Sequence, residues 1–376
     1  MASAIPPTNT KGTDMKASIV REFGAGFATA EIDIAAPIGR EVLIDVKASG
    51  LCHTDLTIMK HDIGYPVPAV HGHELAGVVT AIGPEVTQFA VGDHVVGCLV
   101  QYCGACERCL SGRTYQCLNP AVTLRTADQP PRLSENGTPI GQTFGLAGFA
   151  EQALVHENQL VGVPDAIPFP QAALLGCGVV TGAGAVINTA GVQAGDAIVV
   201  IGAGGVGLNA ISGALVAGAT TIIAVDIADD KLEKARSFGA THTVNSKDVD
   251  ALAAVLEITG RGADAVFDFV GTKQVAEQGL AMVGAGGGLY LIGVIDPTSV
   301  MDVHQVGLIG TQKRVQGVYM GSTTTKRDIP MIAKLYLEGR YELDSLISKE
   351  IALDEVNEGY EALRDSSITR VVITTF

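Results

Sequence analysis

The first part of the chain alternates short apolar runs with turn-forming residues. Apolar and β-branched residues dominate at positions 15–20, 41–48 and 77–82, and Gly-Pro-Glu follows the last run at positions 83–85. Apolar runs of this length, bounded by glycine and proline, are typical of strands. The pattern therefore predicts a region of short strands and turns up to about residue 160.

From about residue 195 the pattern changes to short, wholly apolar runs that alternate with longer helical segments. Such continuous apolar runs are typical of strands buried on both faces, and helices between them imply right-handed crossovers in a parallel sheet. The expected strands are Ala197–Ile201, Thr221–Asp226, 241–244, 263–270 and 289–294, and the expected helices are 206–217, 229–238 and 249–259. Further along, a helix at 328–337 and a terminal strand, Arg370–Thr375, are predicted.

Composition narrows the class of protein. Of the 376 residues 47% are hydrophobic, but the apolar runs are short, and none approaches the roughly 18–20 residues of a membrane span. Residues 1–14 are polar and lack the apolar core of a signal peptide, so we expect a mobile extension there. The formal net charge of −15 argues against nucleic-acid binding. We therefore expect a soluble cytoplasmic protein that binds neither a membrane nor nucleic acid.

Four of the seven cysteines, Cys103, Cys106, Cys109 and Cys117, lie within fifteen residues in the pattern C-x2-C-x2-C-x7-C. A single loop with this spacing can place four thiolates around one ion, and zinc is the metal that suits a closed S4 shell. An iron–sulfur cluster is the nearest alternative, but bacterial ferredoxins place the fourth cysteine after three residues and before a proline. A disulfide framework is disfavoured by the chain length and the odd cysteine count. The pattern predicts structural zinc.

A glycine-rich segment, Gly-Ala-Gly-Gly-Val-Gly, directly follows the predicted strand Ala197–Ile201 and opens a predicted helix. Such a turn lets the backbone approach a pyrophosphate closely, at the N-terminus of the helix. The next strand ends in Asp226, where a carboxylate can accept hydrogen bonds from the ribose of NAD and would repel the extra phosphate of NADP. The residues predicted to bind NAD at the turn are Gly202, Gly204, Gly205, Val206 and Gly207.

Three further short motifs carry metal-binding residue types beside glycine. They are Gly-Leu-Cys-His-Thr-Asp ending at Asp55, Gly-His-Glu ending at Glu74, and Gly-Cys-Gly around Cys177. Each is weak alone, because a lone cysteine or histidine is more often a packed residue than a ligand. Together Cys52, His73 and Cys177 supply the three ligands of an open zinc site, whose fourth position takes water or substrate.

The order of these motifs resembles that of the zinc-dependent medium-chain alcohol dehydrogenases, over nearly the whole chain from Met15 to Phe376. The long insert between Leu118 and Gln142 is similar to that of the long-loop members, which include aryl and benzyl alcohol dehydrogenases and thiol-dependent formaldehyde dehydrogenases. By its polarity alone, the insert could equally be a disordered surface loop.

This resemblance implies an α/β protein with a GroES-like, mostly-β catalytic domain and a Rossmann coenzyme domain built on a doubly wound parallel sheet. The implied limits are 15–180 for the first part of the catalytic domain, 181–325 for the NAD-binding domain and 326–376 for the C-terminal part of the catalytic domain. Two zinc ions per subunit, NAD and a homo-oligomer, either a dimer or a tetramer, are implied as well.

The resemblance also implies the role of each residue. Cys52, His73 and Cys177 would hold catalytic zinc, and the four clustered cysteines would hold structural zinc. Glu74 would lie behind the catalytic metal, and Asp55 would hydrogen-bond His73.

Thr54 would take the proton from the alcohol, although the histidine that ends this relay in many relatives is replaced by Thr57. The remaining implied cofactor contacts are His53, Lys231, Val294 and Arg370, and the implied substrate pocket is Leu99, Thr143, Phe144 and Val294. Cys98 matches no ligand position and is interpreted as a packed thiol.

The implied reaction is the reversible oxidation of a primary alcohol to the aldehyde, through a zinc alkoxide and hydride transfer to NAD. Leu99 and Thr143 replace aromatic residues of relatives that act on small alcohols, so a roomy pocket for aromatic, allylic or terpenoid alcohols is expected. The alternative substrate is the S-hydroxymethyl adduct of a thiol, for which Arg113, Arg125 and Arg132 are candidate anchors.

Overall fold

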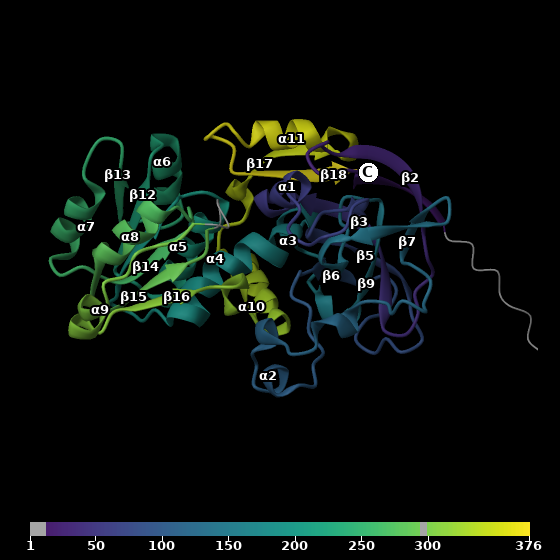
Figure 1. Cartoon of the computed structure of the whole chain (residues 1–376), viewed down its shortest axis with the longest axis horizontal. Coiled ribbons are helices and arrows are strands. Elements are labelled where there is room, and N and C mark those ends of the chain that lie inside the picture. Colours follow the sequence, from purple (N-terminus) through teal and green to yellow (C-terminus); the bar gives the residue numbers. More distant parts are fainter. Residues whose placement is uncertain (1–12, 294–298) are drawn as a thin grey trace, which may run out of the picture.

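The computed structural model describes residues 13–293 and 299–376 (Figure 1). Within this part of the chain, the strands form a closed barrel, a seven-stranded sheet and a six-stranded sheet. The barrel contains β1 (Thr13–Val20), β2 (Ala28–Ile34), β7 (Leu133–Glu135), β8 (Thr138–Gln142) and β4 (Ala69–Val70). Residues 1–12 and Val294 lie outside the described residues. Because β1 starts at Thr13, residues 13–14 belong to the barrel rather than to the expected extension.

The seven-stranded sheet gathers strands from both ends of the chain. It contains β10 (Leu160–Gly162), β6 (His94–Gly97), β5 (Glu74–Ile82), β3 (Glu41–Gly50), β18 (Arg370–Thr375) and β17 (Ile347–Ala352), with β9 (Gln152–His156) also paired to β3. Val372 of β18 pairs with Gly50 of β3, so the terminal strand joins the sheet that carries the first predicted metal ligands. In Figure 1 the yellow C-terminal segment accordingly lies beside the purple N-terminal one.

The six-stranded sheet is parallel throughout. Its order is β13 (His242–Asn245), β12 (Thr221–Asp226), β11 (Ala197–Ile201), β14 (Ala263–Asp268), β15 (Val283–Leu291) and β16 (Arg314–Gly317). In order along the chain this is 3-2-1-4-5-6, the doubly wound arrangement, with the switch point between β11 and β14. The predicted fold class is therefore confirmed.

Helices follow the strands of the parallel sheet; the first three match the predicted helices, and the last two were not predicted. They are α5 (Gly205–Ala217), α6 (Asp229–Ser237), α7 (Ala251–Thr259), α8 (Lys273–Met282) and α9 (Gln305–Thr311). Four α-helices of the described chain lie outside both this sheet and the helical run Phe169–Ala190: α1 (His53–Lys60), α2 (Glu107–Leu110), α10 (Thr325–Leu337) and α11 (Val356–Ala362). The strand expected at 289–294 instead begins at Val283 and ends at Leu291. The expected domain limits remain predictions.

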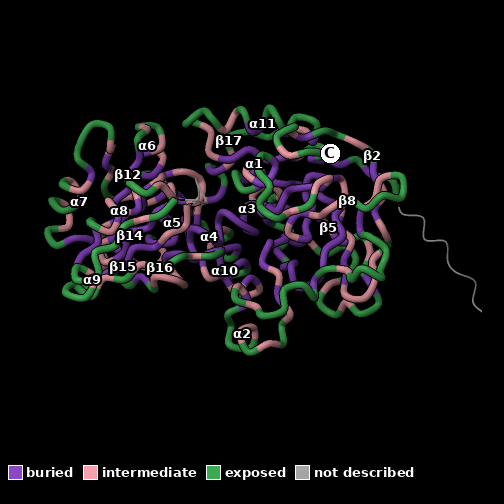
Figure 2. The backbone as a smooth tube through the Cα atoms, in the orientation of Figure 1, coloured by how far each residue is buried: buried purple, intermediate pink, exposed green. Residues whose placement is uncertain are grey.

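One helical run of 22 residues, Phe169–Ala190, is long and apolar enough to cross a membrane, and the sequence-based statement that no run approaches this length was wrong. The run comprises α3 (Phe169–Leu174), α4 (Val180–Gly184) and the π-helical stretches Leu175–Val179 and Ala185–Ala190. Glycines interrupt its apolar residues without breaking the helix. Of the most apolar 18 residues of this run, 83% are buried inside the protein, as expected for a core helix. Figure 2 shows the buried backbone around α3 and α4 in purple.

The insert between Leu118 and Gln142 is ordered and contributes two barrel strands, β7 and β8. Two of its arginines bind the buried carboxylate of Glu41: Arg125 Nη2 lies 2.5 Å from Oε2 and Arg132 Nε lies 2.8 Å from Oε1. These charge-assisted hydrogen bonds hold the insert against the start of β3. Arg125 and Arg132 are therefore engaged in the fold and do not face a substrate carboxylate.

Candidate metal centres and nucleotide-binding turn

The first candidate metal centre collects side chains from three elements. Cys52 is the N-cap of α1 directly after β3, His73 precedes β5, and Cys177 lies in the π-helical stretch Leu175–Val179. Gly50 of β3 pairs with Glu74 of β5, so the ends of these two strands lie side by side. As a result the ligand atoms of Cys52, His73, Glu74 and Cys177 all lie within 4.8 Å of one another, in the interior.

The chemistry of this group fits zinc. Two cysteine sulfurs and one imidazole nitrogen are the ligand set of open, catalytic zinc sites. Nε2 of His73 is buried and has no hydrogen-bond partner among the described residues. Buried polar atoms are normally paired, so a nitrogen left without a partner beside two thiols is the arrangement that a metal ion would complete.

Asp55 lies behind His73 and orients its ring. Oδ2 of Asp55 is 2.9 Å from Nδ1 of His73, at hydrogen-bonding distance but away from the ideal angle. Oδ1 accepts the backbone N–H of Gly72 at 3.2 Å. Burial by itself lowers the pKa of His73, but Asp55 and Cys52 outweigh it and raise that pKa well above the ordinary value. A carboxylate at this distance is suited to accept a proton from Nδ1, which would leave Nε2 free to bind a metal.

Arg370 connects the metal centre to the nucleotide-binding turn. Its Nη1 lies 3.3 Å from Oε1 of Glu74, and both side chains are buried. A Cβ atom added to Gly178 would lie 2.0 Å from Nη2, and one added to Gly205 would lie 2.5 Å from Nε. The guanidinium therefore touches the helical run of Cys177 and the glycine turn at once. Burial raises the pKa of Glu74, and the charge of Arg370 opposes that rise.

The glycine turn has the geometry that the sequence predicts. Gly202 has a φ of 95°, which favours glycine, and Gly204 is the N-cap of α5. A Cβ atom on Gly207 would lie 1.9 Å from the carbonyl oxygen of Gly202, so any larger residue would force the turn open. Asp226 ends β12, and its Oδ2 accepts the N–H of Ala203 at 2.8 Å. The carboxylate thus lies at the turn, where a bound ribose would meet it.

Other predicted residues gather around the same place. His53 and Thr54 are exposed in the first turn of α1. Desolvation, together with the positive charges of Arg370 and Lys231, lowers the pKa of His53, while Cys52 opposes the change. Lys231 and Arg370 thus lie within electrostatic range of His53.

Beside the metal group, Phe144 adopts a φ of 55°, uncommon for a residue other than glycine, in the 3-10 turn Thr143–Gly145. Its ring meets the His73 ring edge-on, with centroids 5.3 Å apart. Tyr65 packs on the Phe144 ring at 4.9 Å and was missed in the sequence because no motif marks it. Leu99 and Thr143 are buried. Phe144 and Tyr65 thus place aromatic rings beside His73.

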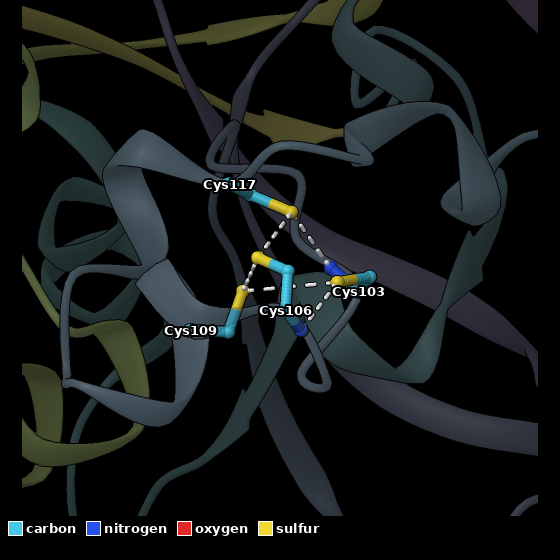
Figure 3. A group of neighbouring side chains, drawn as sticks. All are labelled: Cys103, Cys106, Cys109 and Cys117. Atoms are coloured by element: carbon cyan, nitrogen blue, oxygen red, sulfur yellow. Dashed lines mark hydrogen bonds between the residues drawn. The ribbon is translucent and has the colours of Figure 1, made fainter.

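The thiol cluster forms the second candidate centre (Figure 3). The sulfurs of Cys106 and Cys109 lie 3.5 Å apart, those of Cys103 and Cys109 3.9 Å, and those of Cys106 and Cys117 4.0 Å. A tetrahedral ion with metal–sulfur distances of about 2.3 Å would separate its sulfurs by about 3.8 Å. Backbone N–H groups donate to Cys103 and Cys117, which stabilises thiolates. The four residues therefore fit zinc. Cys98 lies apart, and burial raises its pKa to about 12, as for a packed thiol.

Metal analysis of the purified protein is expected to find two zinc ions per subunit. The Cys106→Ser variant removes one thiolate of the second centre and should retain one ion, with a lower melting temperature because the loop loses its cross-link. Iron in place of zinc would contradict the assignment and favour the iron–sulfur alternative.

Comparison with known proteins agrees with this geometry. The family profile "Alcohol dehydrogenase GroES-like domain" matches residues 39–165, and "Zinc-binding dehydrogenase" matches residues 205–335. The chain belongs to the zinc-dependent medium-chain alcohol dehydrogenase family.

Several individual relatives are similar over nearly their full length. An NDMA-dependent alcohol dehydrogenase of Amycolatopsis methanolica is 40% identical over 366 residues, which are 95% of this chain and 98% of that protein. The S-(hydroxymethyl)glutathione dehydrogenase of Paracoccus denitrificans is 34% identical over 95% of this chain and 99% of its own length. The crystal structure of benzyl alcohol dehydrogenase from Acinetobacter calcoaceticus superimposes with a TM-score of 0.91, at 35% identity, over 97% of this chain and all (100%) of that one.

Proposed function

We propose that this alcohol dehydrogenase is zinc-dependent and uses NAD to oxidise a primary aromatic, allylic or terpenoid alcohol to the aldehyde. The observation that carries the proposal is the position of Arg370, which contacts Glu74 of the metal group and the glycine turn together. An alcohol bound at the open metal position would therefore lie beside a nicotinamide whose pyrophosphate occupies the turn.

The residues around the centre have distinct tasks in this reaction. Zinc bound there supplies a Lewis acid that lowers the pKa of an alcohol. Asp55 holds the imidazole of His73 in one tautomer. Thr54, exposed in the first turn of α1, is proposed to accept the alcohol proton and pass it toward the nicotinamide ribose. Thr57 does not replace the missing histidine as a donor, because its hydroxyl already donates to the carbonyl of His53 at 3.0 Å.

NAD is favoured over NADP by the negative charge at the end of β12. Asp226 lies at the glycine turn, and Asp229 and Asp230 follow in the first turn of α6. A 2′-phosphate there would meet like charges, which costs several kcal/mol. Lys231 and Arg370 are proposed to bind the pyrophosphate instead.

An activity screen tests the proposal directly. With NAD we expect kcat/KM for benzyl alcohol to exceed that for ethanol at least about tenfold, because each added apolar group in a fitting pocket contributes about that much. NADP should support at least about tenfold lower kcat/KM than NAD. Equal values for the two alcohols would contradict the substrate class.

Two further assays test properties that the names of the relatives suggest. Since one relative is named NDMA-dependent, the alcohols are also tested with NDMA in place of added NAD. Activity with NDMA and none with NAD would contradict the proposed cofactor use. Formaldehyde with a thiol tests the alternative substrate. Two of its candidate anchors, Arg125 and Arg132, are bound to Glu41, whereas the third, Arg113, is exposed.

We further propose that a second copy of the chain binds at the outer edge of the parallel sheet. β16 ends the sheet, and α9 beside it has no buried residue, with Val306 and Ile309 exposed. An edge strand can pair with its own copy across a two-fold axis and cover such apolar residues. Light scattering should show a dimer or tetramer that the Ile309→Asp variant dissociates, whereas Val249→Asp, at another exposed valine, should not. A monomeric wild type would contradict this proposal.

A further inference from the structure

Tyr360 of α11 lies directly behind the first metal ligand. The residue is buried, and its hydroxyl donates to the backbone carbonyl of Cys52 at 3.1 Å, although the two are 308 positions apart. The same carbonyl accepts the N–H of Asp55 at 3.1 Å and so begins α1. The peptide of Cys52 is thus held from two sides.

The ring of Tyr360 is itself held in place. It stacks on Phe27, with centroids 5.4 Å apart and an interplanar angle of 16°. The side chain of Asn357 accepts the N–H of Phe27 at 3.0 Å and donates to its carbonyl at 2.8 Å. Asn357 and Tyr360 are three positions apart on α11, so one face of this helix binds both Phe27 and Cys52.

α11 also lies close to the residue before the ligand. A Cβ atom added to Gly359 would lie 2.7 Å from Cδ2 of Leu51 and 2.7 Å from Cδ1 of Ile351. The helix backbone therefore fits directly against Leu51, while Tyr360 reaches past it to Cys52. The backbone at the start of α1 has little room to move away.

The stacked rings of Tyr360 and Phe27 also lie close to His71, two positions before the metal ligand His73. Phe27 meets the ring of His71 edge-on, with centroids 5.7 Å apart. Nδ1 of His71 lies 3.8 Å from Oδ1 of Asp55, the carboxylate that orients His73. The C-terminal helix thus holds Cys52 through a hydrogen bond and, through the stacked ring of Phe27, packs against His71, a neighbour of Asp55.

We propose that Tyr360 is a positioning residue for the catalytic metal centre: its hydroxyl fixes the peptide of Cys52, and thereby the direction of the Cys52 sulfur. The proposal rests on the metal-dependent alcohol oxidation proposed above. No task in proton or hydride transfer is assigned to Tyr360, because its buried hydroxyl is bonded to the backbone carbonyl of Cys52. Groups that orient metal ligands typically contribute tenfold or more to metal affinity or activity.

The test uses Tyr360→Phe, which keeps the ring and its stacking and removes only the hydroxyl. Zinc release to a chromogenic chelator is expected to be about tenfold faster from one of the two sites and unchanged from the thiol cluster. The visible spectrum of the cobalt-substituted protein should change, since it reports the geometry of the sulfur ligands. We expect kcat to fall about tenfold, with less than about a twofold change in KM for the alcohol.

Tyr341→Phe is the matched control. Tyr341 is also a buried tyrosine, and its hydroxyl bonds to the backbone and side-chain oxygens of Asn209, a residue of α5 that belongs to neither metal group, at 3.1 and 2.9 Å. This variant loses a buried hydrogen bond as well, so its melting temperature should fall while its zinc release and cobalt spectrum stay as in the wild type. Phe27→Leu, which keeps the hydroxyl but removes the stacking, should accelerate zinc release by a smaller factor.

Wild-type zinc release and an unchanged cobalt spectrum in Tyr360→Phe would overturn the proposal, as would the same acceleration in Tyr341→Phe. The metal readouts do not depend on finding the right alcohol. If no alcohol is oxidised but Tyr360→Phe still loses zinc faster, the proposed function fails and the positioning role stands.

Discussion

Replacing Cys52 by serine is expected to lower kcat for alcohol oxidation at least about a thousandfold while leaving the fold intact. A bound metal contributes several kcal/mol to such a step, and each 1.4 kcal/mol corresponds to about a factor of ten. Serine removes the thiolate from a group whose ligand atoms lie within 4.8 Å of one another, so the zinc content should fall from two ions to one. Steady-state kinetics and metal analysis on the same preparation measure both effects.

The matched control is Cys98→Ser. Cys98 is buried, as Cys52 is, but belongs to neither group of metal-binding residues. Its replacement should cost some stability, because a hydroxyl is buried in an apolar site, and should leave kcat and two zinc ions in place. Retention of wild-type activity by Cys52→Ser would refute the assignment of the catalytic metal centre.

Replacing Arg370 by leucine is expected to reduce the free energy of unfolding by about 3–5 kcal/mol, because it leaves the carboxylate of Glu74 buried without a partner. The double variant Arg370→Leu/Glu74→Gln removes both charges and should recover at least half of the loss. Denaturant unfolding without added cofactor measures these differences, so the proposed role of Arg370 in NAD binding does not affect them.

The loss in Arg370→Leu should also depend on pH. Burial raises the pKa of Glu74, and loss of the opposing Arg370 charge raises it further. A carboxylate whose folded pKa lies above its unfolded value destabilises the fold at high pH, and protonation relieves the cost as the pH falls. The variant should therefore differ less from wild type at pH 5 than at pH 8.

Arg364→Leu is the control, since Arg364 pairs with Glu361 at an exposed position of the C-terminal region and such pairs contribute no more than about 1 kcal/mol. If Arg370→Leu also lost no more than about 1 kcal/mol of unfolding free energy, the buried carboxylate of Glu74 would not depend on the charge of Arg370.

The nucleotide region could be predicted closely from the sequence because its physical signals are local. Ala197–Ile201 and Thr221–Asp226 are continuous apolar runs with turn residues at both ends, and the structure places strands with the same limits there. The four-cysteine cluster could also be predicted, because all four cysteines lie in one loop of the sequence.

What the sequence did not reveal depends on contacts between distant segments. The glycines of Phe169–Ala190 divide its apolar residues into short runs, so the sequence did not predict one long helix. These glycines are nevertheless helical, because close packing leaves no room for a side chain. Tyr65 and Tyr360 lie in no motif, and only the folded chain brings one to Phe144 and the other to Cys52.

The place of β18 has a consequence for how the protein is made. This strand lies between β3 and β17 inside the seven-stranded sheet and comes last in the described chain. During translation, the strands of the parallel sheet, β11 to β16, are all available well before β18 leaves the ribosome. Until then β3 has an open edge next to Cys52, and both Arg370 and Tyr360 are missing from the metal centre. The first metal centre can therefore take up its final geometry only after β18 has been synthesised and has paired with β3.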